Sequence, residues 1–136
     1  MAIGKIKNRQ QPEVLVNIST ENSTGDGTYI TDVTAYNHHF NQIHVHRIGK
    51  IIELNILTTA TGPITAGVFE TLCTCAFPPI YDMRATAYGA TSADYLDVKG
   101  VVNIARNTGY IRFAPSTEIA SGGTKTFRFN VVYMTA

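Results

Sequence analysis

Two of the four histidines, His44 and His46, have the residue type and spacing that a metal site uses. In a β-strand, side chains two residues apart project from the same face, so both imidazoles could bind one ion. A metalloenzyme would need more ligands, but no histidine follows His46, and Glu53 is the nearby carboxylate. The pair could also surround an ion on the axis of a symmetric trimer. The interpretation we prefer pairs His46 with Glu53 across a hairpin. His44 would then face Asn55, and no metal or cofactor would be bound.

Tyrosine, aspartate and arginine residues gather in a second stretch, between Pro78 and Leu96. The candidates are Tyr81, Asp82, Arg84, Tyr88, Asp94 and Tyr95. A saccharide site needs flat aromatic faces for sugar C–H groups and planar polar groups for paired hydroxyls, and these residue types supply both. The alternative is that the tyrosines belong to ordinary loops and pack on neighbouring strands. The sequence leaves both interpretations open.

Patterns that would indicate an enzyme or a nucleic-acid-binding strand are incomplete in this chain. Asp94 and Asp97 are three residues apart, so on a strand they face opposite sides and cannot form a carboxylate pair. The glycines of residues 121–123 are not followed by a helical pattern that would hold a phosphate. Phe127-Arg128-Phe129 resembles an aromatic and basic RNA-binding strand, but the alternation of core residues explains it better. We therefore expect a protein that is not an enzyme and binds no nucleic acid.

The two histidines lie within residues 43–57, which alternate between apolar and polar side chains and predict a hairpin. If Gly49-Lys50 form its turn, the register follows by counting outward from the turn. This register brings four aliphatic side chains onto one face, those of Ile43, Val45, Leu54 and Ile56. We expect that face to lie in the core, and the histidines to lie on the opposite face.

Short alternating or β-branched segments predict the remaining strands. They lie at residues 13–18, 28–34, 68–77, 84–88, 109–113 and 125–134, with a second hairpin predicted at residues 95–106 about Lys99-Gly100. The apolar spacing typical of a helix does not persist over three turns. Many short strands separated by turn signals favour an all-β fold, an antiparallel β-sandwich of the jelly-roll type.

The composition fits one domain of 136 residues with a net charge of +1. That balance gives no general attraction to nucleic acid or an acidic membrane, and we expect synthesis in the cytoplasm without membrane insertion. Charged residues make up 15%, which is low and hints at burial by partner subunits. Residues 1–27 are expected to form a connecting arm and first strand, and residues 28–136 the main domain. Cys73 and Cys75 are expected to be free, buried thiols.

The order of these features resembles the C-terminal head domains of bacteriophage receptor-binding proteins and tail fibres. After the first hairpin and a threonine-rich loop, a strand ends in Phe77-Pro78-Pro79-Ile80-Tyr81. The chain then closes on the segment 109–113, Gly-Tyr-Ile-Arg-Phe, and a final strand of the form Phe-x-Phe-x-Val-x-Tyr at 127–133. The resemblance covers residues 28–136. It departs from the usual pattern after Tyr81, where Asp82-Met83-Arg84 stands in place of an Arg-Pro pair, and no collagen-like repeat or heptad neck is visible.

This resemblance implies a homotrimeric head that binds saccharides on a bacterial surface without being an enzyme. Such a protein would be made in the host cytoplasm, become part of the phage tail, and contact other tail or baseplate proteins. The alternative is a structural adaptor or decoration protein of the virion that has no glycan ligand.

Overall fold

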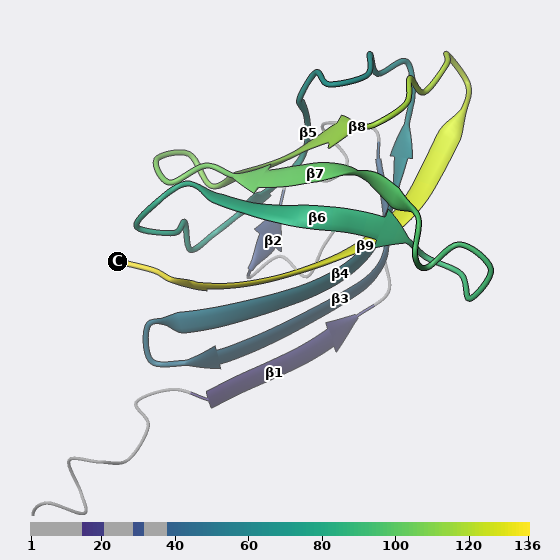
Figure 1. Cartoon of the computed structure of the whole chain (residues 1–136). Helices are drawn as coiled ribbons and strands as arrows, with labels where there is room; N and C mark the ends of the chain where they lie inside the picture. The colour runs from purple at the N-terminus through teal and green to yellow at the C-terminus, as the bar shows by residue number, and fades with distance from the viewer. Residues whose placement is uncertain (1–14, 21–28, 32–37) are drawn as a thin grey trace, which may run out of the picture.

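The computed structural model of the chain describes residues 15–20, 29–31 and 38–136. Nine strands in these residues form one antiparallel sheet in the order β1-β3-β4-β9-β6-β7-β8-β5-β2 (Figure 1). The strands are β1 (Leu15–Thr20), β2 (Ile30–Thr31), β3 (His39–Ile48), β4 (Ile51–Thr61), β5 (Glu70–Cys75), β6 (Met83–Gly89), β7 (Val98–Ile104), β8 (Tyr110–Pro115) and β9 (Thr124–Met134). The predicted all-β, antiparallel fold is confirmed for this part of the chain. Most of the predicted connecting arm lies outside the described residues.

The hairpin of β3 and β4 has the register predicted from its sequence. Ile43 pairs with Ile56, Val45 with Leu54, and His46 with Glu53. Its turn is at Gly49-Lys50, where Gly49 adopts a φ of 57°, a conformation that glycine takes without steric cost. The strands run beyond the predicted residues 43–57, from residue 39 to residue 61. The prediction therefore identified the hairpin and its register but not the full length of its strands.

Strand β9 joins two halves of the sheet. It pairs with β4 over its whole length, but with β6 at two positions only, Tyr88 with Arg128 and Gly89 with Phe127. Away from these pairs the sheet curls, so that β6, β7 and β8 lie over β9, β4 and β3 (Figure 1). Phe113 of β8 stacks on Phe127 of β9 with ring centroids 4.0 Å apart. The two halves of one continuous sheet thus enclose a shared core.

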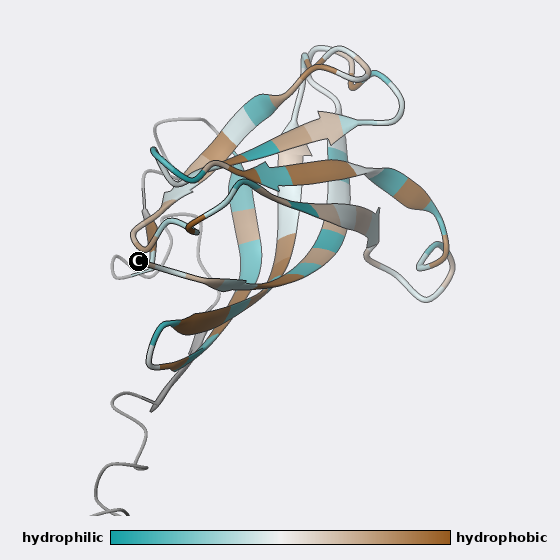
Figure 2. Cartoon of the chain, turned by 60° about the vertical axis from the view of Figure 1, so that its left-hand side comes forward, coloured by the Kyte–Doolittle hydropathy of each residue, from teal (hydrophilic) through white to brown (hydrophobic). Residues whose placement is uncertain are grey.

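The core is filled by every second residue of the long strands, as the alternating colours of Figure 2 show. The largest fully buried side chains are Phe40, Phe113, Phe127, Ile30, Ile43, Ile52, Leu54, Ile56, Leu72, Ile104 and Ile111. Each such side chain stabilises the fold by about 1.5–3 kcal/mol relative to an exposed one. Cys73 and Cys75 are buried thiols that form no disulfide, as predicted.

The predicted second hairpin about Lys99-Gly100 is wrong. These residues lie inside β7, which pairs with β6 on one side and β8 on the other. A side chain at Gly100 would meet the carbonyl oxygen of Ala114 and the ring of Phe113, so this glycine permits a close approach of strands and makes no turn. The hairpin instead joins β6 to β7 through residues 90–97. The sequence signal for a glycine turn and for a close strand approach is the same, which explains the error.

No helix of the described residues is both long enough and apolar enough to cross a membrane.

Candidate functional site

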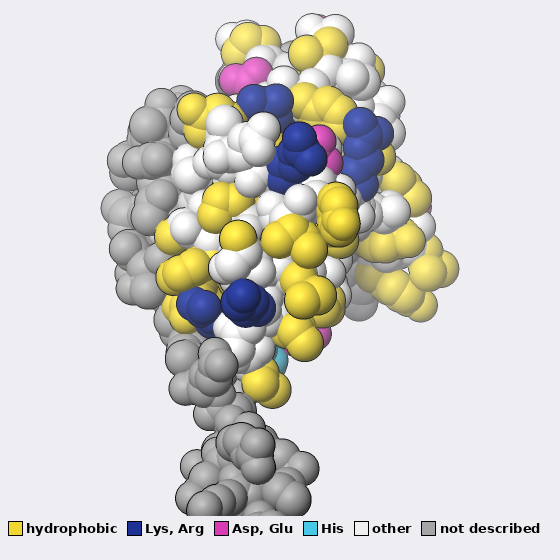
Figure 3. Space-filling model, turned by 90° about the vertical axis from the view of Figure 1, so that its left-hand side faces the viewer, with side chains coloured by type: hydrophobic (Ala, Val, Ile, Leu, Met, Phe, Trp, Pro, Cys, Tyr) yellow, Lys and Arg dark blue, Asp and Glu magenta, His cyan; other side chains and the backbone are white. Residues whose placement is uncertain are grey.

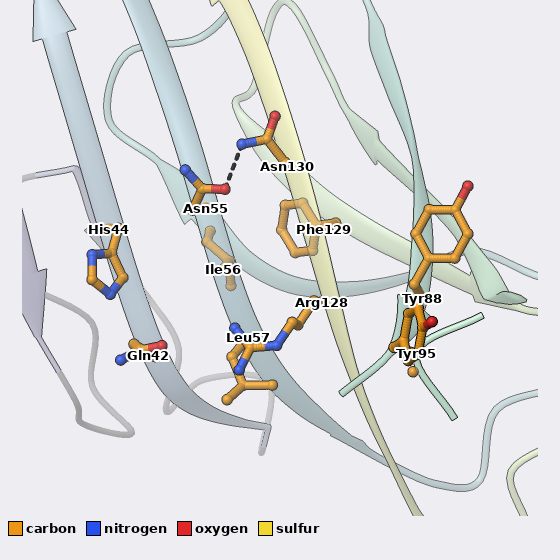
Figure 4. A pocket seen from close by; sticks show the side chains of 11 residues that line it. Gln42, His44, Asn55, Ile56, Leu57, Tyr88, Tyr95, Arg128, Phe129 and Asn130 are labelled. Carbon is orange, nitrogen blue, oxygen red and sulfur yellow. Dashed lines mark hydrogen bonds between the residues drawn. The ribbon is translucent and has the colours of Figure 1, made fainter. Parts of the chain in front are cut away.

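A pocket opens on the outer face of the sheet, where β3, β4, β9 and the end of β6 are neighbours (Figure 4). Its volume of about 310 Å³ is at the small end of the range for ligand sites in proteins. The residues that line it are Gln42, His44, Asn55, Ile56, Leu57, Tyr88, Gly89, Tyr95, Arg128, Phe129 and Asn130. The pocket therefore lies on the histidine face of the first hairpin, extended across two further strands.

Two rows of paired residues form the floor of this pocket. The first row crosses β3, β4, β9 and β6 as Gln42, Leu57, Arg128 and Tyr88. The second row crosses β3, β4 and β9 as His44, Asn55 and Asn130. Because side chains alternate along a strand, burial of the intervening Ile43, Ile56 and Phe129 in the core directs both rows outward. The core pattern thus fixes which polar groups meet.

Two tyrosines lie together on the side of the pocket away from His44 (Figure 4). Tyr88 ends β6 and is 45% exposed, and Tyr95 lies in the following loop and is 59% exposed. Exposed aromatic rings that frame a pocket leave their faces available to a ligand. Both tyrosines were among the six residues predicted from the sequence.

Asp94, another of the six candidates, holds the loop that carries Tyr95. Its Oδ1 accepts hydrogen bonds from the backbone N–H of Thr91 (2.8 Å) and from the Thr91 hydroxyl (2.7 Å). Its Oδ2 is 3.3 Å from Nζ of Lys99. The hydrogen bonds from Thr91, and then Lys99, hold the pKa of this carboxyl below its usual value. Asp94 therefore positions the loop from outside the pocket.

The other three candidates from the sequence lie elsewhere. Asp82 accepts a hydrogen bond from the backbone N–H of Arg106 (2.9 Å) and so fixes the turn after β7. The guanidinium of Arg84 lies 5.5 Å from the ring centroid of Phe69, and Arg84 lines a neighbouring hollow together with Tyr88. Tyr81 lies in an apolar groove near the C-terminal end of β9. The structure brings together Tyr88 and Tyr95, and separates Tyr81 from them.

A chain of side-chain hydrogen bonds orients the amides of the second row. Asn130 Nδ2 donates to Asn55 Oδ1, as the dashed line in Figure 4 marks. Asn55 Nδ2 donates in turn to Glu53 Oε1 (3.2 Å). The same carboxylate oxygen lies 3.2 Å from Nδ1 of His46, which confirms the predicted pairing of His46 with Glu53. This chain holds the two amides in place and leaves the carbonyl oxygen of Asn130 available as an acceptor.

The first row offers groups with no partner of their own. Among the residues that the structure describes, the guanidinium of Arg128 makes no hydrogen bond or ion pair, and neither does the side-chain amide of Gln42. Arg128 can donate up to five hydrogen bonds, and Gln42 can both donate and accept. The pocket thus combines aromatic faces, amides, an imidazole and one guanidinium, a set suited to a ligand rich in hydroxyl groups.

The described residues contain no group of three or more histidine, cysteine, aspartate or glutamate side chains arranged to hold a metal ion. His44 lies opposite Asn55 in the sheet, as the hairpin register predicted.

Four polar residues of the pocket were not predicted: Gln42, Asn55, Arg128 and Asn130. All four occupy outward positions on strands whose inward neighbours were recognised as core. The missing information was the pairing of β4 with β9 and of β9 with β6, since strands distant in sequence become neighbours there. The sequence showed the alternation of apolar residues in β9, but it did not show which strands pair with β9.

A second surface feature, which we call the apolar end patch, lies beside the turn of the first hairpin and the end of β9. It consists of the exposed side chains of Ile48, Ile51, Ile80, Tyr81, Val132 and Met134. Several of them border a groove of about 370 Å³. Figure 3 shows hydrophobic side chains gathered on this end of the molecule, with lysine and arginine side chains around them. A contiguous apolar surface of this kind is typical of a contact with another chain.

Comparison of the chain with protein-family models, with curated proteins and with solved structures found no match.

Proposed function

We propose that this chain is the saccharide-binding head of a bacteriophage receptor-binding protein or tail fibre, and that it is not an enzyme. The observation that carries the proposal is the convergence of Tyr88 and Tyr95 with unpaired polar groups in one outward pocket. The sequence resemblance to phage head domains, stated for residues 28–136, supports the same function. The natural setting would be the virion, where the chain contacts other tail or baseplate proteins after its synthesis in the host cytoplasm.

The chemistry of the pocket supports a sugar better than an apolar ligand. Tyrosine rings pack against the C–H faces of a pyranose, while amide and guanidinium groups bond to its hydroxyls. The polar groups stand on paired strands, and the loop that carries Tyr95 is fixed by Asp94. Groups held on rigid elements lose little freedom on binding, which favours recognition by a shallow site.

We further propose that the heads assemble as a homotrimer of jelly-roll-like domains. The apolar end patch and the charged fraction of 15% support burial of part of this surface by other copies. Three linked copies of a weak sugar site would raise the overall avidity by about 10² to 10⁴. Such a gain makes a small, open pocket useful for attachment to a repetitive cell surface.

The proposal is tested by measuring binding to an array of bacterial surface polysaccharides. We expect the wild-type protein to bind, and the double variant Tyr88→Ala/Tyr95→Ala to lose at least roughly tenfold in affinity, as when central aromatic contacts are removed. Tyr110→Ala is the matched control, because Tyr110 lies on β8 outside the pocket. Thermal unfolding of each variant verifies that the fold is kept.

The second candidate is a structural adaptor or decoration protein of the virion, which the apolar end patch also favours. It differs from the first candidate in predicting that the wild-type protein binds no polysaccharide on the array. Binding that survives in the double tyrosine variant would also contradict the proposed site.

A further inference from the structure

The geometry points to a saccharide that carries an anionic group, a carboxylate or a phosphate, with Arg128 as the residue that binds this group. The inference rests on the proposed function, because it names the class of sugar that the same pocket takes. It is carried by the charges in and around the pocket.

Arg128 is the formally charged side chain among the described residues that line the pocket, and no aspartate or glutamate is among them. In the described part of the chain the Arg128 guanidinium has no ion pair and no hydrogen bond. A guanidinium beside a ligand pocket with no internal partner is matched best by an anion, because its planar fork fits a carboxylate or phosphate.

The carboxylates next to pocket residues in the sequence are already paired. Glu53, two residues before Asn55, binds His46 and Asn55. Asp94, which precedes Tyr95, binds Thr91 and lies 3.3 Å from Lys99.

Asp97, two residues after Tyr95, is also near a cation, with its Oδ2 3.9 Å from Nζ of Lys99. Asp94 and Asp97 therefore share Lys99, and Glu53 is held by His46 and Asn55. None of them lines the pocket or neutralises Arg128. The field in the pocket is that of an uncompensated positive charge.

The position of Arg128 also fits one end of a sugar ring. In Figure 4 the Arg128 side chain extends from β9 over Leu57, on the side away from the two tyrosines, while Asn55 and Asn130 lie one row away along the strands. A pyranose that packs on a tyrosine ring can place its hydroxyls toward the amides and an acidic substituent toward Arg128. The apolar side chain of Leu57 limits water on one side of the guanidinium, which strengthens a charged contact.

The test compares matched sugars by nuclear magnetic resonance titration of the ¹⁵N-labelled protein. The probes are D-glucose and D-galactose, the corresponding uronates, and the corresponding 6-phosphates. We expect the acidic forms to bind at least roughly tenfold more tightly than the neutral forms, which is the gain in affinity that one charge-assisted hydrogen bond provides. The preference should shrink as salt rises, because Arg128 is exposed to solvent. Comparison of uronate with phosphate identifies which anion the site takes.

Arg128→Gln should remove the preference for acidic sugars, so that the acidic and neutral forms of each sugar bind with about equal affinity. The matched control is Arg106→Gln, which removes the same charge from the turn at the far end of β7. Equal affinities for neutral and acidic sugars, or a preference that survives in Arg128→Gln, would overturn this inference and leave the saccharide function standing. Absence of binding by every sugar would overturn both.

Discussion

At the scale of single residues, His38 is a histidine that the fold removes from water. It is buried, and its Nδ1 accepts a hydrogen bond from the backbone N–H of Thr61 (3.1 Å). Burial lowers the pKa of His38 below its ordinary value of 6.5, and the negative charge of Glu70 offsets part of this effect. The imidazole is therefore neutral in the folded protein over a pH range in which the unfolded chain already binds a proton.

This arrangement predicts that the protein becomes less stable in acid. As the pH falls from about 6.5 through the lower pKa of the folded state, the unfolded chain takes up more protons than the folded one, so the free energy of unfolding decreases. His38→Asn keeps an acceptor for the Thr61 N–H and removes the titration, so its stability should change less between pH 7.5 and pH 5. Urea unfolding at several pH values measures this. His39→Asn, at an exposed neighbouring position, is the control and should retain the wild-type dependence.

At the scale of elements, β7 depends on the absence of a side chain at Gly100. This strand lies between β6 and β8, and the position of a Cβ at Gly100 is already taken by Ala114 backbone and the Phe113 ring. Phe113 in turn stacks on Phe127 across the core. The close approach at Gly100 therefore sets how the two halves of the sheet meet.

Gly100→Ala should destabilise the fold by about 1–3 kcal/mol, the usual cost of overpacking a close-packed core. Urea unfolding provides the measurement. Val101→Ala is the matched control, because Val101 is the next residue of β7 and points to solvent. Its change should stay within roughly 0.5 kcal/mol. If Gly100→Ala were as stable as the wild type, β7 and β8 would not be packed as closely as described.

At the scale of the whole molecule, the outer face of the sheet carries two distinct surfaces. The ligand pocket is lined by polar and aromatic side chains at the level of Asn55 and Asn130. The apolar end patch lies along the same strands, where Ile51 pairs with Met134. One sheet can thus present a sugar site and a subunit contact side by side.

The homotrimer proposal predicts a mass of three chains by gel filtration with light scattering. Ile51→Glu/Met134→Glu should shift the protein toward the monomer, because two glutamates from each chain, six in the trimer, would be introduced into the apolar end patch. Val68→Glu is the control, since Val68 is equally exposed but lies outside the patch. A wild-type protein that is a stable monomer would contradict the assembly. Affinity for a single sugar should be the same in monomer and trimer.

The sequence by itself determined the position of most strands and the register of the first hairpin. Because side chains alternate with a period of two residues, the sequence shows which residues of 43–57 face the core. The local turn at Gly49-Lys50 sets the pairing of the two strands. It also singled out Tyr88 and Tyr95 as candidates, because tyrosine, aspartate and arginine residues gather between Pro78 and Leu96. These inferences need only residues that are near one another in the chain.

Only the tertiary structure decided which strands are neighbours, and therefore what the pocket contains. The row of Gln42, Leu57, Arg128 and Tyr88 joins four strands from distant parts of the chain. Backbone hydrogen bonds are the same for any pair of strands, so a strand's own sequence does not name its partner. Packing of both halves of the sheet on one core selects the partners. That selection places Arg128 in one pocket with Tyr88 and Tyr95 and leaves Tyr81 in the apolar end patch.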